Sequence, residues 1–463
     1  MLSVAYQGSG DRSGPLAWGQ QALWNACQRT RPEDRYFNFS RDFTVPPEHA
    51  FDVDRVGGAL SRVLGRHEAL RTTLLADEPR PVQVVRSAGR LDVEVRRCAP
   101  DDVDAVVAAT MAEYEARTFD YVGELPLRVA FVVTDDTRLG GAARVVQVVF
   151  CFCHLAADFN ASQVVLDDFA RYLLEGGVGL PDAPQPLDLV AVQRGPVGQR
   201  ASERALAYWE AEYRRIPPTM FPVPRAVAQE PPFWTGAISS AALGKAVTLV
   251  AARYELSSSA VVLAACAGMA AELAGRDVCA MLAIVANRFR PAQRQLVSSL
   301  SMEGLLVVEI DRGATFAALA RRTGRSALAR TYRFAEYDET ARDAMFARVN
   351  KDRGQTVHPY CCYNDLRGEP ERGADSGAAP DLAALSSAMS RTEFGWTRKL
   401  PKVRCRFCLH IIGGAPLFRA DLTADTRYLP PDTIERYLHG VERLLVESAA
   451  RDVPLGELSE MLR

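Results

Sequence analysis

The residues best suited to chemistry are His154 and Asp158, which follow a continuous apolar run at residues 148–153. A run this rich in valine and phenylalanine predicts a strand that is buried on both faces. Apolar residues then recur at helical spacing between Val164 and Leu173, so the two polar residues mark the junction of a strand and a helix. Loops held between rigid elements often carry catalytic groups.

Each of these residues also has a simpler interpretation. A lone histidine beside an apolar strand is usually a satisfied core or loop residue, because one titratable group proves little about function. Asp158 alone is most simply the cap of the following helix. A catalytic interpretation therefore depends on the rest of the chain.

Length and composition narrow the class of protein. The chain has 463 residues, of which 48% are hydrophobic and 24% charged, and its net charge is −2. These values predict a globular protein of two or three domains, and the scattered basic residues argue against a nucleic-acid binder. The sequence contains no apolar stretch of about 18 residues and no secretory signal at its start, so we expect a cytoplasmic protein that does not bind a membrane.

Ten cysteines are many for such a chain, but their spacing does not resemble a disulfide framework. Cys405 and Cys408 form a CxxC pair, and Cys361 and Cys362 are adjacent. The alternative is a strand that places Cys405, Phe407 and Leu409 on one face. Because the paired CxxC pattern of a strong zinc signal is missing, we favour the strand and expect no metal.

The two halves of the chain have similar size and content. Strand-like and helical segments alternate in each, which favours an α/β sandwich and a pair of similar lobes. Proline and glycine are frequent in residues 175–200, which we interpret as a linker. We therefore expect an N-terminal lobe at residues 1–180 and a C-terminal lobe at residues 181–463, the latter including a linker helix that carries Tyr208 and Trp209.

Several sequence blocks together resemble the condensation domains of nonribosomal peptide synthesis. The family's opening helix, which ends in a Leu-Trp pair, is matched by residues 16–24, and its His-Glu-x-Leu-Arg-Thr block by residues 67–72. Residues 153–159 match the HHxxxDG motif in part, reading CHxxxDF. An Asp-Phe-Ala block lies at residues 168–170, and Asn287-Arg288 matches an element of the second lobe.

The resemblance implies two chloramphenicol-acetyltransferase-like α/β sandwich lobes arranged as a V-shaped pseudo-dimer. Carrier-bound substrates would enter a tunnel between the lobes, with His154 at its centre as the catalytic residue. Asp158 would be held by Arg288 from the other lobe, and this pair would fix the loop that presents the histidine. Cys153 would take the place of the first motif histidine, as a structural residue of the active site.

Two departures from the family pattern lie where substrates would bind. The motif glycine is Phe159, whose ring would narrow or block the tunnel, and Met302 replaces a tunnel-lining asparagine. The expected tunnel residues are Phe159, Asn160, Ser162, Ser301 and Met302.

The resemblance implies an enzyme that joins a carrier-bound acyl or aminoacyl thioester to an amine or hydroxyl acceptor, giving an amide or ester. It would need no cofactor of its own, because the substrate arrives on the phosphopantetheine arm of a carrier protein. Adenylation, carrier and thioesterase regions are not recognised, so we expect a stand-alone monomer that meets its carriers in trans and takes a small-molecule acceptor. Two alternatives remain: a non-catalytic module that binds carrier-bound intermediates or recruits tailoring enzymes, and an acyltransferase that uses coenzyme A thioesters.

Overall fold

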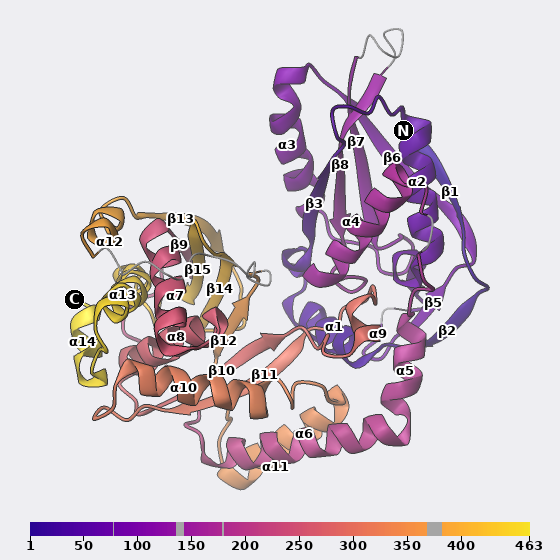
Figure 1. The fold of residues 1–463 in the computed structure, drawn as a ribbon. Coiled ribbons are helices and arrows are strands. Elements are labelled where there is room, and N and C mark those ends of the chain that lie inside the picture. The colour runs from indigo at the N-terminus through magenta and orange to yellow at the C-terminus, as the bar shows by residue number, and fades with distance from the viewer. Residues whose placement is uncertain (77, 136–142, 178–179, 368–381) are drawn as a thin grey trace. The chain divides into compact units, whose positions relative to one another are not determined.

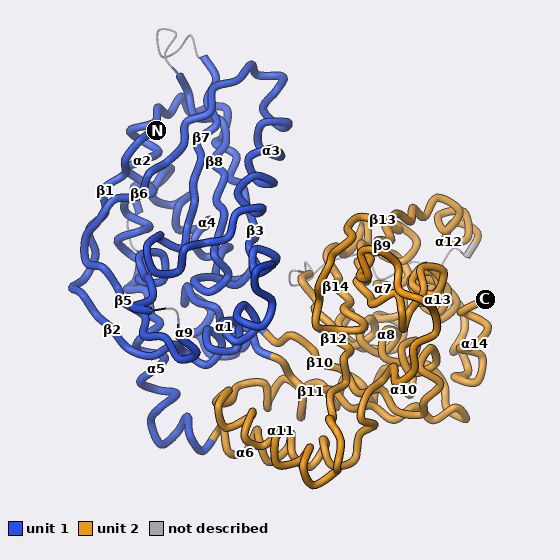
Figure 2. The backbone as a smooth tube through the Cα atoms, turned by 180° about the vertical axis from the view of Figure 1, so that it is seen from behind, with its two compact units in different colours: residues 1–200, 286–302 blue, residues 201–285, 303–463 orange. Residues whose placement is uncertain are grey.

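The computed structural model describes residues 1–76, 78–135, 143–177, 180–367 and 382–463. The chain forms two compact units (Figure 2). Unit 1 comprises Met1–Arg200 and Ala286–Met302, and unit 2 comprises Ala201–Val285 and Glu303–Arg463. The domain boundary between residues 180 and 181 stays a prediction. The compact unit itself continues past that point and also takes in a segment from the second half of the chain.

Unit 1 is built on a five-stranded mixed sheet with the strand order β1-β6-β7-β8-β3, and a three-stranded sheet with the order β2-β5-β4 (Figure 1). Its strands are β1 (Leu2–Gln7), β2 (Arg12–Pro15), β3 (Phe39–Thr44), β4 (Thr72–Leu74), β5 (Val82–Val85), β6 (Ala88–Arg97), β7 (Leu127–Asp135) and β8 (Ala143–Phe152). Its helices are α1 (Trp18–Thr30), α2 (Val53–Arg66), α3 (Val103–Glu115), α4 (Phe159–Leu174), α5 (Pro186–Arg194) and α9 (Pro291–Arg294).

Both faces of strand β8 are covered along residues 148–152, as the unbroken apolar sequence there predicts. Phe150 belongs to a core that includes residues of α2 and α4, whereas Cys151 belongs to a second core that includes residues of α1 and α3. Successive side chains of a strand point to opposite faces, so a strand between two cores needs apolar residues at every position. The predicted doubly buried strand is therefore confirmed, and it is a rigid base for the polar residues that follow it.

Unit 2 contains a seven-stranded mixed sheet with the order β11-β10-β12-β14-β15-β9-β13 (Figure 1). Its strands are β9 (Phe233–Ser240), β10 (Val278–Val285), β11 (Met302–Glu309), β12 (Cys361–Asp365), β13 (Glu393–Leu400), β14 (Phe407–Gly413) and β15 (Phe418–Asp425). The helices are α6 (Pro196–Arg215), α7 (Ala241–Tyr254), α8 (Ser258–Ala274), α10 (Phe316–Ser326), α11 (Glu339–Arg353), α12 (Leu382–Met389), α13 (Pro431–Ala450) and α14 (Leu458–Met461).

Helices α7, α8 and α13 pack on one face of the unit 2 sheet. Tyr437 of α13 meets the ring of Phe407 on β14 edge to face at 5.0 Å. The Tyr437 hydroxyl donates to the carbonyl of Cys266 on α8, at 3.0 Å. Helices against a mixed sheet in each unit confirm the expected α/β class.

Much of the expected linker at residues 175–200 is helical. Helix α5 occupies Pro186–Arg194, and α6 begins at Pro196. Both prolines stand in the first helical turn, where the missing backbone N–H removes no intrahelical bond, so here they start helices rather than interrupt them. The predicted linker helix is α6, where the Trp209 indole N–H donates to the Phe334 carbonyl at 3.0 Å within unit 2.

Among the described residues, no single helix is long and apolar enough to cross a membrane. Helices α7 and α8 together have the length and apolar composition of a membrane span, but the pair is bent by 107°.

Candidate active site

His154 lies in the short turn between β8 and α4, and its ring is held by the backbone of that turn. The ring Nδ1 is 3.0 Å from the carbonyl oxygen of Ala157. A carbonyl only accepts hydrogen bonds, so Nδ1 must carry the proton of the neutral imidazole. This contact therefore leaves Nε2 with a free lone pair, which is the form that can accept a proton from a nucleophile.

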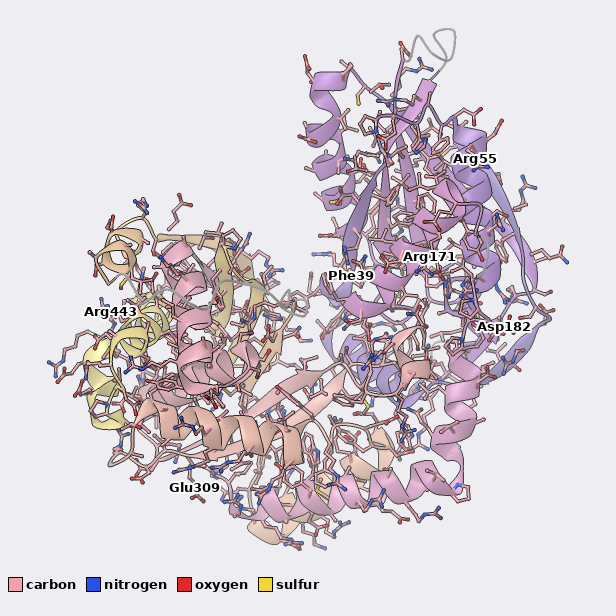
Figure 3. The ribbon with its side chains drawn as sticks, viewed as in Figure 1. Phe39, Arg55, Arg171, Asp182, Glu309 and Arg443 are labelled. Carbon is pink, nitrogen blue, oxygen red and sulfur yellow. A yellow bond between two sulfur atoms is a disulfide. The ribbon has the colours of Figure 1, made fainter. Side chains whose placement is uncertain are left out.

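The surroundings of His154 favour this neutral form. The edge of its ring meets Phe39 of β3, labelled in Figure 3, with a distance of 5.4 Å between the ring centroids. Burial lowers the pKa of His154 below its usual value, and the nearby Asp158 carboxylate offsets only part of this effect. The side chain keeps partial exposure, so an incoming group can reach it.

Asp158 is buried and is the N-cap of helix α4. Its carboxylate accepts from the backbone N–H of Ala161 at 2.8 Å and from that of Leu300 at 3.0 Å. It also accepts from the Ser301 hydroxyl at 3.2 Å and from the guanidinium of Arg288 at 2.7 Å. One carboxylate thus fixes the start of α4 and joins it to residues 300 and 301.

The expected pairing of Arg288 with Asp158 is present, and both residues belong to unit 1. Arg288 follows strand β10 of unit 2, but the segment Ala286–Met302 belongs to unit 1. Besides Asp158, its guanidinium donates to the carbonyl oxygens of Gln293, Leu296 and Ser298 at 2.7–3.0 Å. The buried cation therefore holds its own segment in a tight loop against the motif.

Two backbone features allow this segment to come so close. Asn287 has a positive φ of 53°, a conformation that asparagine adopts more readily than most residues, and its side-chain amide donates to the Leu300 carbonyl at 3.1 Å. Gly19 of α1 faces the same loop, and a Cβ there would lie 2.5 Å from the carbonyl oxygen of Ser299. Glycine is thus required at this position by the close approach of two backbones.

Phe159 is the first residue of α4, and 41% of its surface is exposed. Its ring lies under the guanidinium of Arg41, whose Cζ is 4.6 Å from the ring centroid. Arg41 also donates to the Ser162 hydroxyl at 3.1 Å. The ring therefore does not fill the core beneath the motif, and Asn160 beside it is exposed as well.

Three of the four remaining predicted site residues are buried. Burial raises the pKa of the Cys153 thiol, so that it is protonated at neutral pH and cannot replace the histidine as a base. Ser162 and Met302 are also buried, whereas Ser301 is partly exposed and donates to Asp158. The structure thus brings Asp158, Arg288 and Ser301 into direct contact, while Ser162 belongs to the neighbouring contact with Arg41.

Two of the sequence blocks are joined to each other beside α4. The imidazole Nε2 of His67 is 2.9 Å from the Asp168 carboxylate, and Arg66 donates to the same oxygen at 2.7 Å. All three side chains are largely buried, and the two partners lower the pKa of Asp168 in spite of its burial. These blocks therefore tie α2 to α4 and have a structural part in this unit.

Sequence reasoning missed Phe39, Arg41, Ala157 and Gln20 as parts of the site. The Gln20 amide lies 3.4 Å from the Leu155 carbonyl, next to the histidine turn. Ala157 acts through its backbone, and the other three lie more than a hundred residues away in the sequence, so the pattern around His154 contains no signal for them.

Comparison with known proteins identifies the family. A family model described as the condensation domain matches residues 15–346, so the chain belongs to the condensation domain family. Members of this family are acyltransferase-type enzymes that work with carrier proteins and need no cofactor of their own. The resemblance stated from the sequence blocks is thereby confirmed.

The curated relatives are much longer than this chain. Isonitrile lipopeptide synthase of Mycobacterium tuberculosis is 27% identical over 371 residues, which cover 74% of this chain and 14% of that protein. Fusarin C synthetase of Gibberella fujikuroi is 25% identical over 214 residues, covering 45% of this chain and 5% of that protein. The chain thus spans a small part of the length of these relatives.

Solved condensation domains have the same fold at low sequence identity. The condensation domain of the Monacolin K polyketide synthase MokA has a TM-score of 0.71 at 16% identity, covering 96% of this chain and 99% of that one. The domain that mediates chain release from the enacyloxin polyketide synthase has a TM-score of 0.70 at 17% identity, covering 95% and 83%. The starter condensation domain of rhizomide synthetase, a mutant in complex with C8-CoA, has a TM-score of 0.70 at 16% identity, covering 96% of each chain.

Proposed function

We propose that this protein condenses a carrier-bound acyl or aminoacyl thioester with an amine or hydroxyl acceptor. The acceptor attacks the thioester carbonyl, a C–N or C–O bond forms, and the C–S bond breaks. The proton of the acceptor passes to Nε2 of His154, and the phosphopantetheine thiol leaves after taking up a proton. The product is an amide or an ester in natural-product biosynthesis.

The observation that carries this proposal is the hydrogen bond between His154 Nδ1 and the Ala157 carbonyl. It fixes the tautomer in which Nε2 is the free base. The lowered pKa keeps that base neutral at physiological pH, and general base catalysis of this kind contributes about 10²–10⁴-fold to a rate. A ring anchored to a rigid turn also supports catalysis by positioning the nucleophile.

The anchor of this turn supports the same function. Asp158 joins the cap of α4 to residues 300 and 301, and Arg288 holds the loop that contains them. Both side chains are buried in mutual contact. We assign them the task of keeping the histidine turn in place, and we assign Phe159, Asn160 and Ser301 to the path of the substrate.

The test is a reconstituted condensation reaction with purified carrier proteins. A carrier loaded with an acyl or aminoacyl group is the donor, a second loaded carrier or a free amine or alcohol is the acceptor, and mass spectrometry of the carrier arm detects the product. We expect product only with the protein present. The free coenzyme A thioester of the same acyl group is run in parallel, and its use at equal rate would instead identify a coenzyme A-dependent acyltransferase.

One observation favours a second candidate, a non-catalytic module that binds carrier-bound intermediates or recruits tailoring enzymes. Phe159 stands at the motif glycine, and its exposed ring under Arg41 occupies space beside the histidine turn. If loaded carriers bind the protein but no donor and acceptor pair reacts, this second function replaces the first.

A further inference from the structure

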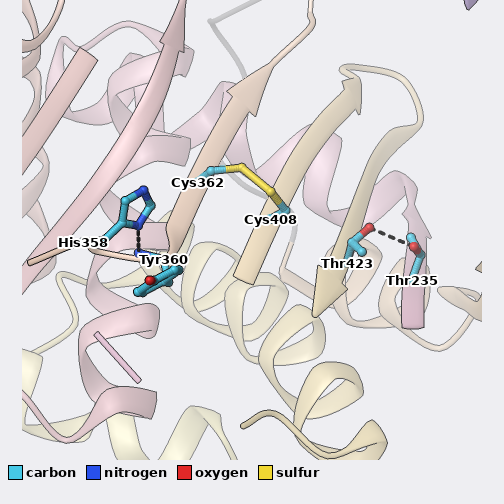
Figure 4. Close-up of a disulfide and its surroundings, with 6 residues drawn as sticks. All are labelled: Thr235, His358, Tyr360, Cys362, Cys408 and Thr423. Atoms are coloured by element: carbon cyan, nitrogen blue, oxygen red, sulfur yellow. Dashed lines mark hydrogen bonds between the residues drawn. A yellow bond between two sulfur atoms is a disulfide. The ribbon is translucent and has the colours of Figure 1, made fainter. Parts of the chain in front are cut away.

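Three cysteines of unit 2 bring their sulfur atoms together, outside the residues assigned to catalysis. The Sγ atoms of Cys362, Cys405 and Cys408 all lie within 4.8 Å of one another. Cys362 and Cys408 are joined by a disulfide bond (Figure 4). Cys405 is a free thiol. The condensation reaction proposed above uses none of these thiols.

The sheet positions two of the three sulfurs. Cys362 of β12 and Cys408 of β14 are register partners on neighbouring parallel strands, with their Cα atoms 4.7 Å apart. The same register row continues through Thr423 of β15 to Thr235 of β9, whose hydroxyls are 2.8 Å apart (Figure 4). The ring of Phe407 packs against Tyr437 of helix α13. Successive side chains of a strand point to opposite faces of the sheet, so Cys408 and its register row lie on the face away from α13.

The CxxC spacing places the third sulfur, that of Cys405, close to Cys408. The sequence pattern placed Cys405 on the same face of a strand as Phe407, but β14 begins only at Phe407. Cys405 lies in the segment before it, so its side chain is free to turn towards Cys408. The backbone N–H groups of Arg406 and Phe407 both donate to the Tyr360 carbonyl, at 3.0 and 3.1 Å, which fixes this segment against the start of β12.

The segment that enters β12 is held just as firmly. Tyr360 has a positive φ of 51°, a conformation that residues other than glycine rarely adopt and that persists only where the surroundings impose it. Its N–H donates to Nδ1 of His358 at 3.0 Å (Figure 4). Both cysteine-bearing segments are therefore fixed before any ligand binds, which favours a preformed site.

The geometry of the cluster suits a metal ligand set. Three sulfur atoms converge from two fixed segments, and a bound metal ion deprotonates a coordinating thiol. Zinc binds thiolate sulfur at about 2.3 Å, which puts tetrahedral sulfur ligands about 3.8 Å from one another, inside the spread of this cluster.

We propose that Cys362, Cys405 and Cys408, once the disulfide is reduced, bind one thiophilic metal ion of the Zn²⁺ class. A thiol or phosphine reductant supplies two electrons, and two protons complete the thiols of Cys362 and Cys408. Metal binding then forms three metal–sulfur bonds and releases the three thiol protons. Among the described residues, no histidine, aspartate or glutamate joins the three sulfurs, so the fourth position is left to water or a small ligand.

The test is a metal titration of the full chain. The protein is first reduced with a phosphine and stripped of metal with a chelator. It is then titrated with Co²⁺, whose thiolate complexes are detected by their charge-transfer absorption. Zn²⁺ is finally added to displace the bound Co²⁺. We expect one equivalent of Co²⁺ to bind, and Zn²⁺ to replace it. The oxidised protein, whose disulfide ties up two of the ligands, should bind neither ion at this site.

Two substitutions and a control complete the test. Cys405→Ser removes a ligand from a partly exposed segment without touching the disulfide pair, so it should fold normally and bind at least about 100-fold more weakly. Cys362→Ser should have the same effect, and Cys98→Ser, which removes a partly exposed thiol of unit 1, should bind as the wild type does. Absence of metal binding by the reduced wild type, or equal affinity in Cys405→Ser, would overturn the proposal.

Discussion

Replacement of Asp158 by alanine should destabilise unit 1 far more than any other single change in the histidine turn. The substitution leaves the buried guanidinium of Arg288 without its carboxylate, and removing one partner of a buried ion pair costs about 3–5 kcal/mol. It also removes the cap of α4, which is worth about 1 kcal/mol. The two losses share one carboxylate and are not additive, so we expect a total of about 3–5 kcal/mol.

Two variants separate these contributions. Asp158→Asn keeps an oxygen that can accept from the Ala161 N–H but loses the negative charge. The free energies of unfolding of Asp158→Asn and Asp158→Ala should therefore differ by about 1 kcal/mol or less. Cys153→Ala shortens a buried side chain that carries no charge at neutral pH, and it should cost about 1 kcal/mol, the usual size of such an effect.

The assay must be local, because a chain with two units need not unfold in one step. Urea unfolding gives the free-energy difference, and hydrogen exchange in peptides from residues 155–165 and 296–302 localises it. In Asp158→Ala the amides of Ala161 and Leu300, which bond to the carboxylate, should lose protection first. Equal unfolding free energies for Asp158→Ala and Cys153→Ala would refute the assignment of Asp158 as the anchor.

Three further predictions concern the substrate path and pH. Phe159→Gly should widen the range of substrates accepted in competition assays. It should lower the free energy of unfolding by about 1 kcal/mol or less, because the ring is exposed and mainly stacks under Arg41. A loss of about 3–5 kcal/mol, as for core phenylalanines, would contradict this. The condensation rate should fall on the acid side only at a pH below 6.5, because burial lowers the pKa of His154 and keeps the ring neutral at lower pH. A fall that begins above pH 6.5 would argue against His154 as the base. Burial also lowers the pKa of His410 from 6.5 to about 4, so as the pH falls the unfolded state takes up a proton before the folded state does. The free energy of unfolding should therefore decrease by about 3 kcal/mol between pH 6.5 and pH 4. This decrease should be smaller in His410→Gln.

The sequence predicted those features that depend on local pattern. The unbroken apolar run identified β8, because a strand between two cores needs apolar residues at every position. The motif blocks identified the family from residues that are adjacent in the chain. The same reasoning placed His154 and Asp158 at a strand–helix junction, where the structure has them.

The features that the sequence did not predict depend on contacts between distant segments. Proline content suggested a linker where Pro186 and Pro196 in fact begin helices, since the same residue suits both roles and only packing decides. The orientation of Phe159 depends on Arg41, which lies on strand β3. The resemblance implied that Arg288 pairs with Asp158, but the close approach of Ala286–Met302 also depends on the absent side chain of Gly19, and no local pattern reports such an approach.

The most direct test of the account is the rate of condensation by His154→Ala with loaded carriers. The ring Nε2 is the proposed proton acceptor, so its removal should lower turnover by about 10²-fold or more while carrier binding stays unchanged. Cys153→Ala, which alters the neighbouring motif position without removing a base, should retain most of the activity. If His154→Ala forms product at the wild-type rate, the histidine is not the catalytic group and the central claim is wrong.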